Sequence, residues 1–124
     1  MRMLIISNDT AAASELLTGF RAAGFSVDHA QRSKQGSFWA RTTDYDLVLI
    51  DDSGGTNAAD ICAHIRARGK TMPILVVSDK PATPSKISLL DSGADDCVSK
   101  ECSIAELTAR VRAILRRPKT IIED

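Results

Sequence analysis

The stretch Tyr45-Asp46-Leu47-Val48-Leu49-Ile50-Asp51 holds four consecutive apolar residues and ends on a carboxylate. A run that is apolar at every position is typical of a strand covered on both faces, as in the middle of a parallel sheet. It predicts a central strand over Asp46–Asp51. A carboxylate at the carboxyl end of such a strand lies where open α/β sheets form their binding crevice. Asp51 is therefore the first candidate site residue.

Strand-like and helix-like segments alternate on both sides of this stretch. Short apolar runs predict four more strands, at Met3–Ile6, Phe25–His29, Pro73–Ser78 and Asp96–Ser99. Helical patterns cover Thr10–Ala23, Ser33–Thr42, Ala58–Ala67, Ser85–Asp91 and Ile104–Arg116, and the second is weak because Gly36 interrupts it. Five strand–helix units in a row predict an α/β fold with one doubly wound parallel sheet and right-handed crossovers.

Composition excludes several classes of protein. A length of 124 residues favours one domain. With 16 basic and 16 acidic residues the chain has no basic excess, which argues against direct binding to nucleic acid. No apolar run is long enough to cross a membrane, and the first residues do not resemble a signal peptide. The three cysteines lack metal-ligand spacing, so we expect reduced thiols and a cytoplasmic protein.

Polar residues follow several of the predicted strands. Because parallel strands end at one edge of the sheet, they should gather around one crevice. They are Ser7, Asn8 and Asp9 after the first strand, Asp51 after the third, Ser78 at the end of the fourth and Lys100 after the fifth.

The last third of the chain resembles a known family. The runs Leu89-Leu90-Asp91-Ser92-Gly93-Ala94-Asp95-Asp96 with Lys100, and Glu106-Leu107-Thr108-Ala109-Arg110-Val111-Arg112 with Arg116-Arg117, are similar to response-regulator receiver domains of the OmpR/PhoB subfamily of transcription factors. The stretch from Tyr45 to Asp51 fits the same family, and the likeness covers essentially the whole chain.

The resemblance implies a fold, a domain plan and no enzymatic activity. The fold would be a single flavodoxin-like (βα)5 domain with a parallel sheet in the order 2-1-3-4-5. Residues 1–117 would form the receiver domain, and residues 118–124 would begin a linker to a winged-helix DNA-binding domain that this chain lacks. DNA would be contacted only through that absent domain, with no membrane association and a histidine kinase as a candidate partner.

The resemblance also implies roles for individual residues. Asp51 would accept a phosphoryl group, Ser78 would supply the switch hydroxyl, and Lys100 would be the fixed cation. Cys97 stands where the family has the aromatic residue that couples the site to the far face.

Several positions depart from the family pattern. Phosphoryl transfer to a carboxylate needs a metal to neutralise charge, and Mg²⁺ is held by carboxylates, carbonyls and waters. The acidic pair of the family falls on the neutral Ser7 and Asn8, leaving the amide of Asn8 and the backbone of Ser53 as oxygen ligands. Asp9 either caps the first helix or, by a one-residue slip, enters the site. We therefore expect no high-affinity metal site and only weak Mg²⁺ binding.

Two further departures lie near Lys100. The Lys-Pro peptide of the family is Lys100-Glu101 here, and a non-proline cis bond is costly, so we expect a trans peptide. Asp79 follows Ser78 where a small residue is usual, and it is a candidate partner for Lys100.

The surface of the last two helices keeps the pattern by which the subfamily dimerises. The resemblance implies a two-fold interface with pairs between subunits: Lys86 with Glu106, Asp96 with Arg110, and Asp95 with Arg117. Ile87 and Leu90 would form its apolar centre. We expect such pairs to fix register and partner choice more than affinity.

These observations favour an atypical receiver of a transcription regulator that dimerises without Mg²⁺-dependent phosphorylation. One alternative is a conventional two-component switch that is phosphorylated at Asp51. Another is a single-domain signalling adaptor that binds a protein or a small ligand in the altered pocket.

Overall fold

Five strands form one parallel sheet in this computed structural model, which describes residues 1–52, 57–79 and 83–116. The strand order is β2-β1-β3-β4-β5, which confirms the predicted doubly wound α/β topology. The strands are β1 (Arg2–Ile6), β2 (Ser26–Ala30), β3 (Leu47–Asp52), β4 (Ile74–Ser78) and β5 (Asp96–Ser99).

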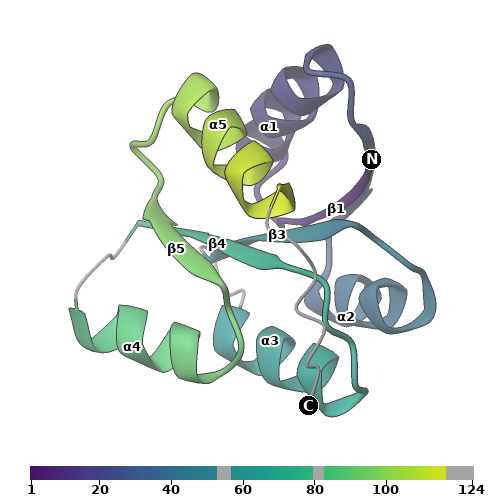
Figure 1. Cartoon of the computed structure of the whole chain (residues 1–124), viewed down its shortest axis with the longest axis vertical. Coiled ribbons are helices and arrows are strands. Elements are labelled where there is room, and N and C mark those ends of the chain that lie inside the picture. The colour runs from purple at the N-terminus through teal and green to yellow at the C-terminus, as the bar shows by residue number, and fades with distance from the viewer. Residues whose placement is uncertain (53–56, 80–82, 117–124) are drawn as a thin grey trace.

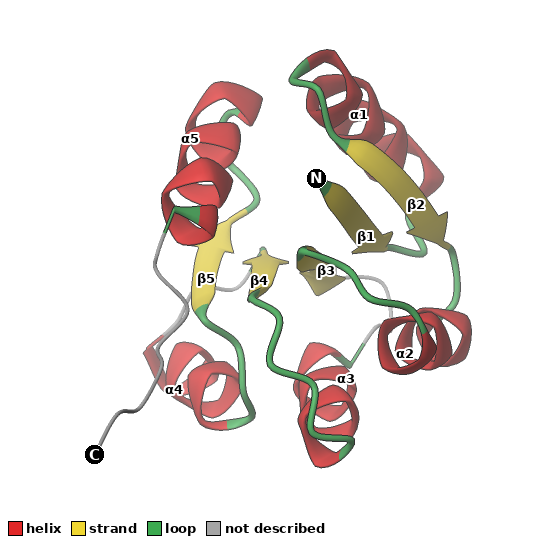
Figure 2. Cartoon of the chain, turned by 45° about the vertical axis from the view of Figure 1, so that its right-hand side comes forward, coloured by secondary structure: helices red, strands yellow, loops and turns green. Residues whose placement is uncertain are grey.

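Helices cover both faces of the sheet, as Figures 1 and 2 show. Helices α1 (Thr10–Ala22) and α5 (Ile104–Leu115) lie on one face. Helices α2 (Ser33–Thr42), α3 (Ala58–Ala67) and α4 (Thr83–Asp91) lie on the other. Each predicted element is present, and its ends differ from the prediction by at most two residues, as is usual where helices and strands fray. Helix α4, for example, begins at Thr83 rather than Ser85.

The central strand β3 explains why the sheet needs two layers of helices. Leu47, Val48, Leu49 and Ile50 are all at most 1% exposed. Successive side chains of a strand point to opposite faces. Val48 and Ile50 accordingly pack with α3, and Leu47 and Leu49 pack with α1 and α5. Asp51 continues this buried strand, so its carboxylate is fixed by the core.

Helix α2 is continuous, contrary to the expectation that Gly36 weakens it. Gly36 is buried in the middle of the helix, and a Cβ placed there would come within 2.5–2.8 Å of three carbon atoms of the Ile6 side chain. The absence of a side chain lets the α2 backbone approach β1 directly. Gly36 therefore acts as a packing residue, which the local sequence pattern did not indicate.

None of the helices within the described ranges is long and apolar enough to span a membrane.

Candidate functional site

The carboxylate of Asp51 lies at the carboxyl end of β3 and is 1% exposed. Ser7, just after β1, donates a hydrogen bond from Oγ to Asp51 Oδ2 at 2.8 Å. Lys100, just after β5, places Nζ 3.2 Å from Asp51 Oδ1. A buried charge is tolerated only when it is paired and hydrogen-bonded. Both oxygens of this carboxylate are bound in that way, so the three residues form one connected cluster.

Ser7 is itself held by its neighbours. Its side chain is fully buried and also accepts a hydrogen bond from the backbone N–H of Asp9 at 3.2 Å. Its carbonyl oxygen lies 3.0 Å from Nε2 of His29 on β2. Contacts on both its side chain and its backbone fix Ser7 beside Asp51. Sequence reasoning missed His29, because only the pairing of β1 with β2 brings it to Ser7.

Two other carboxylates at this edge of the sheet bind helix termini. Asp9 Oδ1 accepts hydrogen bonds from the backbone N–H groups of Ala11 and Ala12, so Asp9 is the N-cap of α1. Asp52 Oδ1 accepts a bond of 3.4 Å from Ala58 at the start of α3. Asp9 was expected either to cap the first helix or to enter the site, and the structure shows that it caps the helix.

This arrangement is a poor donor set for Mg²⁺. The ion prefers an octahedral shell that includes one or two carboxylates. Asp51 is bound by Ser7 and Lys100, Asp9 caps α1, and Asp52 accepts a hydrogen bond from the backbone at the start of α3. Across the described ranges, no three His, Cys, Asp or Glu residues are grouped to hold a metal ion. Asn8 is exposed beside the site, and the expected backbone ligand, Ser53, lies outside the described residues.

The predicted switch residues are close to this cluster. Ser78 is 2% exposed at the end of β4, and its register partners are Asp52 on β3 and Ser99 on β5. The backbone N–H of Lys100 donates to the carbonyl of Ser78 at 3.0 Å, which ties the lysine to β4. The structure therefore brings Asp51, Ser78 and Lys100 to one edge of the sheet.

Cys97 is buried in the core between the sheet and α4 and is 9% exposed. Burial raises the pKa of its thiol, so the neutral form is favoured.

Two expectations near Lys100 have different outcomes. No cis peptide occurs in the described part of the chain, so the Lys100-Glu101 bond is trans, as expected.

Asp79 is exposed and forms no ion pair within the described residues, whereas Lys100 binds Asp51. The suggested pairing of Asp79 with Lys100 is therefore wrong. A buried carboxylate needs the lysine more than an exposed one, because water already solvates the latter.

The fold, together with Asp51, Ser78 and Lys100 at its carboxyl edge, is matched by a family model. The model describes the response regulator receiver domain and matches residues 3–112. The chain belongs to the response-regulator receiver family.

Named relatives of this receiver are transcription regulators of the OmpR/PhoB type. The probable transcriptional regulatory protein SilR of Salmonella typhimurium is 38% identical over 125 residues, which cover 100% of this chain and 55% of SilR. The transcriptional regulatory protein CusR of Escherichia coli K12 is 37% identical over 123 residues, which cover 98% of this chain and 54% of CusR. This chain thus spans about half the length of these curated relatives. They are named as regulators of transcription, not as enzymes.

Solved structures match the receiver over most of its length. The receiver domain of the Francisella response regulator 1452 has a TM-score of 0.88 and 28% identity, covering 95% of this chain and 98% of that one. An atypical orphan response regulator, described with a phosphorylation-independent regulatory mechanism, has a TM-score of 0.82 and 31% identity, covering 94% of this chain and 96% of that one.

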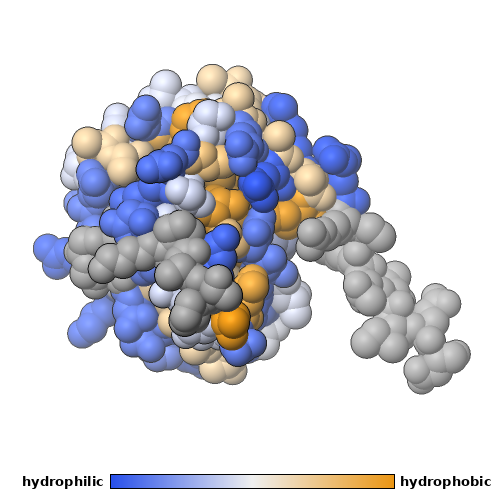
Figure 3. Space-filling view, turned by 90° about the vertical axis from the view of Figure 1, so that its left-hand side faces the viewer, coloured by the Kyte–Doolittle hydropathy of each residue, from blue (hydrophilic) through white to orange (hydrophobic). Residues whose placement is uncertain are grey.

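The predicted dimer surface of the receiver lies on α4, β5 and α5, at the edge of the sheet. Figure 3 shows this side of the molecule, where apolar and charged surfaces are interspersed. Ile87 and Leu90 on α4 are 53% and 47% exposed, so two large apolar side chains of one helix face solvent. Lys86 beside them is partly exposed. Arg117, which was expected in the same surface, lies outside the described residues.

The charged residues of this surface contact one another within the single chain. Arg110 Nη1 lies 3.4 Å from Asp96 Oδ2, and Arg110 Nε lies 3.2 Å from Glu106 Oε2. The hydrogen bond from the Cys102 thiol, followed by that from Arg110, lowers the pKa of the Glu106 carboxyl. Arg110 can therefore bind acidic groups on β5 and α5 at once, with its guanidinium still exposed.

Asp95 has partners that the sequence did not indicate. Its Oδ2 accepts hydrogen bonds from Arg66 Nη2 at 2.9 Å and from the backbone N–H of Ile74 at 2.8 Å. The same guanidinium of Arg66 donates to the carbonyl of Gly93. Asp95 is thus held in place from α3 and β4, and Arg66 would share it with any second partner.

Proposed function

We propose that this receiver controls transcription as the regulatory part of an OmpR/PhoB-like protein, and that its output does not require Mg²⁺-dependent phosphorylation of Asp51. The observation that carries the proposal is the cluster in which Ser7 and Lys100 both bind the carboxylate of Asp51. Ser7 occupies a position where the family has an acidic metal ligand, and its hydroxyl binds the carboxylate instead.

The cluster opposes the usual chemistry in two ways. Phosphorylation of Asp51 would replace the carboxylate that Ser7 and Lys100 now bind, so both contacts would have to rearrange. The transferring phosphoryl group also carries negative charge, and among the described residues Lys100 is the cation that lies next to Asp51 to offset it without a metal. We therefore expect weak Mg²⁺ binding and slow phosphorylation. The likeness to an atypical orphan regulator supports this proposal without testing it.

Output would instead come from association of two receivers through α4, β5 and α5. Ile87 and Leu90 would form the apolar centre, with Lys86, Glu106, Asp96 and Arg110 around it. Such an arrangement, with apolar anchors inside a polar rim, is typical of protein interfaces. The dimer would position a DNA-binding domain in a longer chain, as the names SilR and CusR suggest for proteins about twice this length.

A conventional phosphorylation switch is the second candidate. Asp51, Ser78 and Lys100 all lie at the carboxyl edge of the sheet, as that function requires. In this case a histidine kinase would act on the chain and the cluster would open during the reaction.

Mass spectrometry of the intact chain after incubation with acetyl phosphate and Mg²⁺ separates the two candidates. We expect little or no phosphorylated species from the wild type. A Ser7→Asp/Asn8→Asp variant restores the acidic pair and should gain the modification, and the same variant with Asp51→Asn should not. Stoichiometric phosphorylation of wild-type Asp51 would refute the phosphorylation-independent proposal and support the conventional switch.

A further inference from the structure

The side chain of Arg66 on α3 joins two loops that lead into neighbouring strands. Its Nη1 donates hydrogen bonds to the carbonyls of Lys70 and Met72, before β4, at 3.0 and 2.7 Å. Its Nε and Nη2 donate to the carbonyl of Gly93, before β5, at 3.1 and 2.9 Å. Nη2 also binds Asp95 Oδ2 at 2.9 Å. Every N–H of the guanidinium therefore has an acceptor, which the planar fork of arginine allows and the ammonium of lysine does not.

Gly93 provides the space that this arginine needs. Its φ is +119°, in a region that glycine adopts readily and other residues rarely do. A Cβ added at Gly93 would lie 2.5 Å from Cγ of Arg66. The missing side chain thus permits both the turn and the close passage of the arginine stem. The loop between α4 and β5 is therefore fitted to Arg66.

Helix α4 depends on this loop for its position. Figure 1 shows α4 beside α3 on the same face of the sheet. Among residues 85–91, the part of α4 whose side chains the structure describes, Leu89 is the buried one. The N–H of Gly93 donates to the carbonyl of Leu90 at 3.1 Å, which joins the end of α4 to the loop. Because Arg66 holds Gly93, it also holds the end of α4 and its exposed Leu90.

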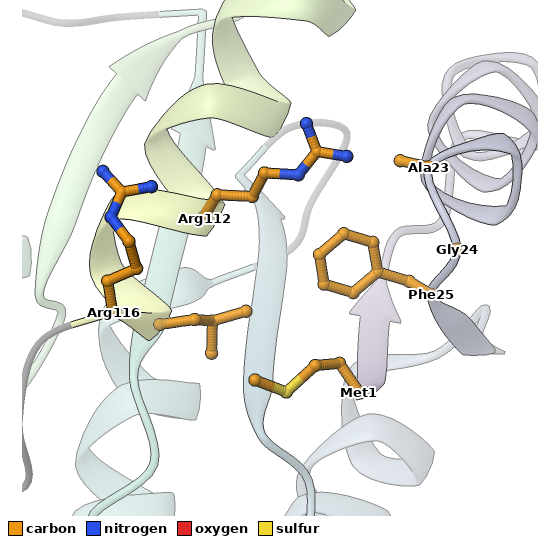
Figure 4. Close-up of a pocket in the computed structure, with 7 residues that line it drawn as sticks. Met1, Ala23, Gly24, Phe25, Arg112 and Arg116 are labelled. Carbon is orange, nitrogen blue, oxygen red and sulfur yellow. The ribbon is translucent and has the colours of Figure 1, made fainter.

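Arg66 also balances charge at the β5 end of the proposed dimer surface. Asp95 and Asp96 are adjacent and partly exposed, so each copy would present both carboxylates to the other. Among the described residues, Asp96 pairs with Arg110 and Asp95 pairs with Arg66. Arg112, on the same helix as Arg110, extends toward the end of α1 instead and lines a pocket of about 400 Å³ there, as Figure 4 shows. Within the described ranges, neutralisation of Asp95 therefore comes from α3 and not from α5.

We propose that Arg66 is a positioning residue for the association of two receivers, although it lies on α3, outside the α4–β5–α5 surface. It fixes the loop between α4 and β5, so that Leu90 and Asp96 keep one relative position. A two-fold interface joins the same patch of both copies, so a displaced α4 would disturb both halves of it. The inference rests on the proposed association through α4, and it adds α3 to the elements on which that association depends.

Arg66 also has a simpler role. Its hydrogen bonds to backbone carbonyls stabilise the fold, whatever the surface of α4 does. That role alone predicts that a change at Arg66 weakens the fold but leaves the dissociation constant of the folded chain unchanged. The test must therefore compare association between folded chains.

Arg66→Lys keeps the positive charge but loses the fork, so it cannot bind both loops at once. We expect the dissociation constant from sedimentation velocity to rise at least about fivefold, because a loosened α4 has to be ordered again when two copies meet. Arg68→Lys makes the same chemical change at an exposed position at the end of α3 and should leave the constant unchanged. Urea unfolding checks that each chain is folded, and trimethylamine N-oxide, added equally to all samples, keeps a weakened variant folded.

Amide hydrogen exchange shows whether the effect passes through α4. The N–H groups of Gly93 and Ala94 bind carbonyls at the end of this helix. In Arg66→Lys we expect both to exchange at least about tenfold faster, with β1 unchanged, because local opening follows the loss of local contacts. Arg68→Lys should exchange like the wild type at both positions.

The oligomeric state of the wild type separates this inference from the proposed function. A wild type that stays monomeric would refute association through α4 and this inference with it. A wild-type dimer whose dissociation constant is the same in Arg66→Lys would overturn the inference alone. An increased constant without faster exchange at Gly93 would also overturn it, because Arg66 would then act without positioning α4.

Discussion

Asp51 shows how single residues decide what a conserved fold can do. Its position is set by β3, whose burial on both faces was predicted from the run Leu47–Ile50. The partners of its carboxylate were harder to predict. Lys100 was expected from the family pattern, but the bond from Ser7 depends on side-chain geometry across two strands that no local pattern encodes.

Removing the Ser7 hydroxyl should destabilise the receiver. Ser7→Ala removes a hydrogen bond to a buried carboxylate, and hydrogen bonds to charged groups contribute about 1.5–3 kcal/mol. We expect a fall of that size in the free energy of unfolding, measured by urea denaturation. Ser14→Ala, on the exposed face of α1, is the matched control and should change stability by less than about 0.5 kcal/mol. A loss no larger than that of the control would show that Asp51 does not depend on Ser7.

The hydroxyl of Tyr45 should lose its proton at an unusually high pH. Burial and the hydrogen bond that its hydroxyl donates to Asp28 at 2.7 Å raise the pKa of Tyr45 to about 12. The folded state therefore favours the neutral phenol. Its stabilising contribution is complete below the ordinary pKa near 10 and is lost as the pH rises toward 12.

The chain has a single tyrosine, so phenolate absorbance reports Tyr45 alone. We expect a midpoint near pH 12 in the folded chain and near pH 10 in denaturant. Asp28→Asn removes the negative charge and should lower the folded midpoint. A folded midpoint equal to the denatured one would contradict the buried contact.

At the scale of elements, sequence patterns identified each strand and helix of the described residues but not how closely these elements pack. Alternation of apolar runs with helical periodicity was sufficient for the order of elements, since each signal is local. Gly36 was expected to weaken α2, but it lets a continuous α2 pack closely against β1. Its low helix propensity is a local property, whereas its contact with Ile6 depends on the position of α2 over β1. Tertiary packing therefore outweighed propensity.

Gly36→Ala should consequently destabilise the receiver although alanine favours helices. The gain in propensity is roughly 0.5–1 kcal/mol, whereas overpacking a core contact costs about 1–3 kcal/mol. We expect a net loss of unfolding free energy and a lower midpoint of thermal unfolding. Lys34→Ala, exposed on the same helix, should be neutral or slightly stabilising. A gain of stability for Gly36→Ala would mean that α2 can move away from Ile6 at little cost.

At the scale of the whole molecule, the family resemblance leads to different predictions for the Asp51 site and for the α4–β5–α5 surface. Ser7 and Asn8 stand where the resemblance places an acidic pair, while the α4–β5–α5 surface carries the charged residues that we propose for dimerisation. The sequence supports both predictions only through residue identity at matched positions. It did not indicate that Arg66 binds Asp95, since that contact joins α3 to the start of β5.

Self-association should depend on the apolar residues of α4. We expect sedimentation velocity of the unphosphorylated chain to show a dimer fraction that grows with concentration. Ile87→Ser/Leu90→Ser should raise the dissociation constant at least about tenfold, because apolar anchors at the centre of an interface each contribute more than 1 kcal/mol. Phe38→Ser is the matched control, since Phe38 is 56% exposed but lies on α2, outside this surface. A chain that stays monomeric at high concentration would exclude association through α4, because no dimer would form. An equal effect of Phe38→Ser would also exclude it, because association would then not depend on the α4 surface.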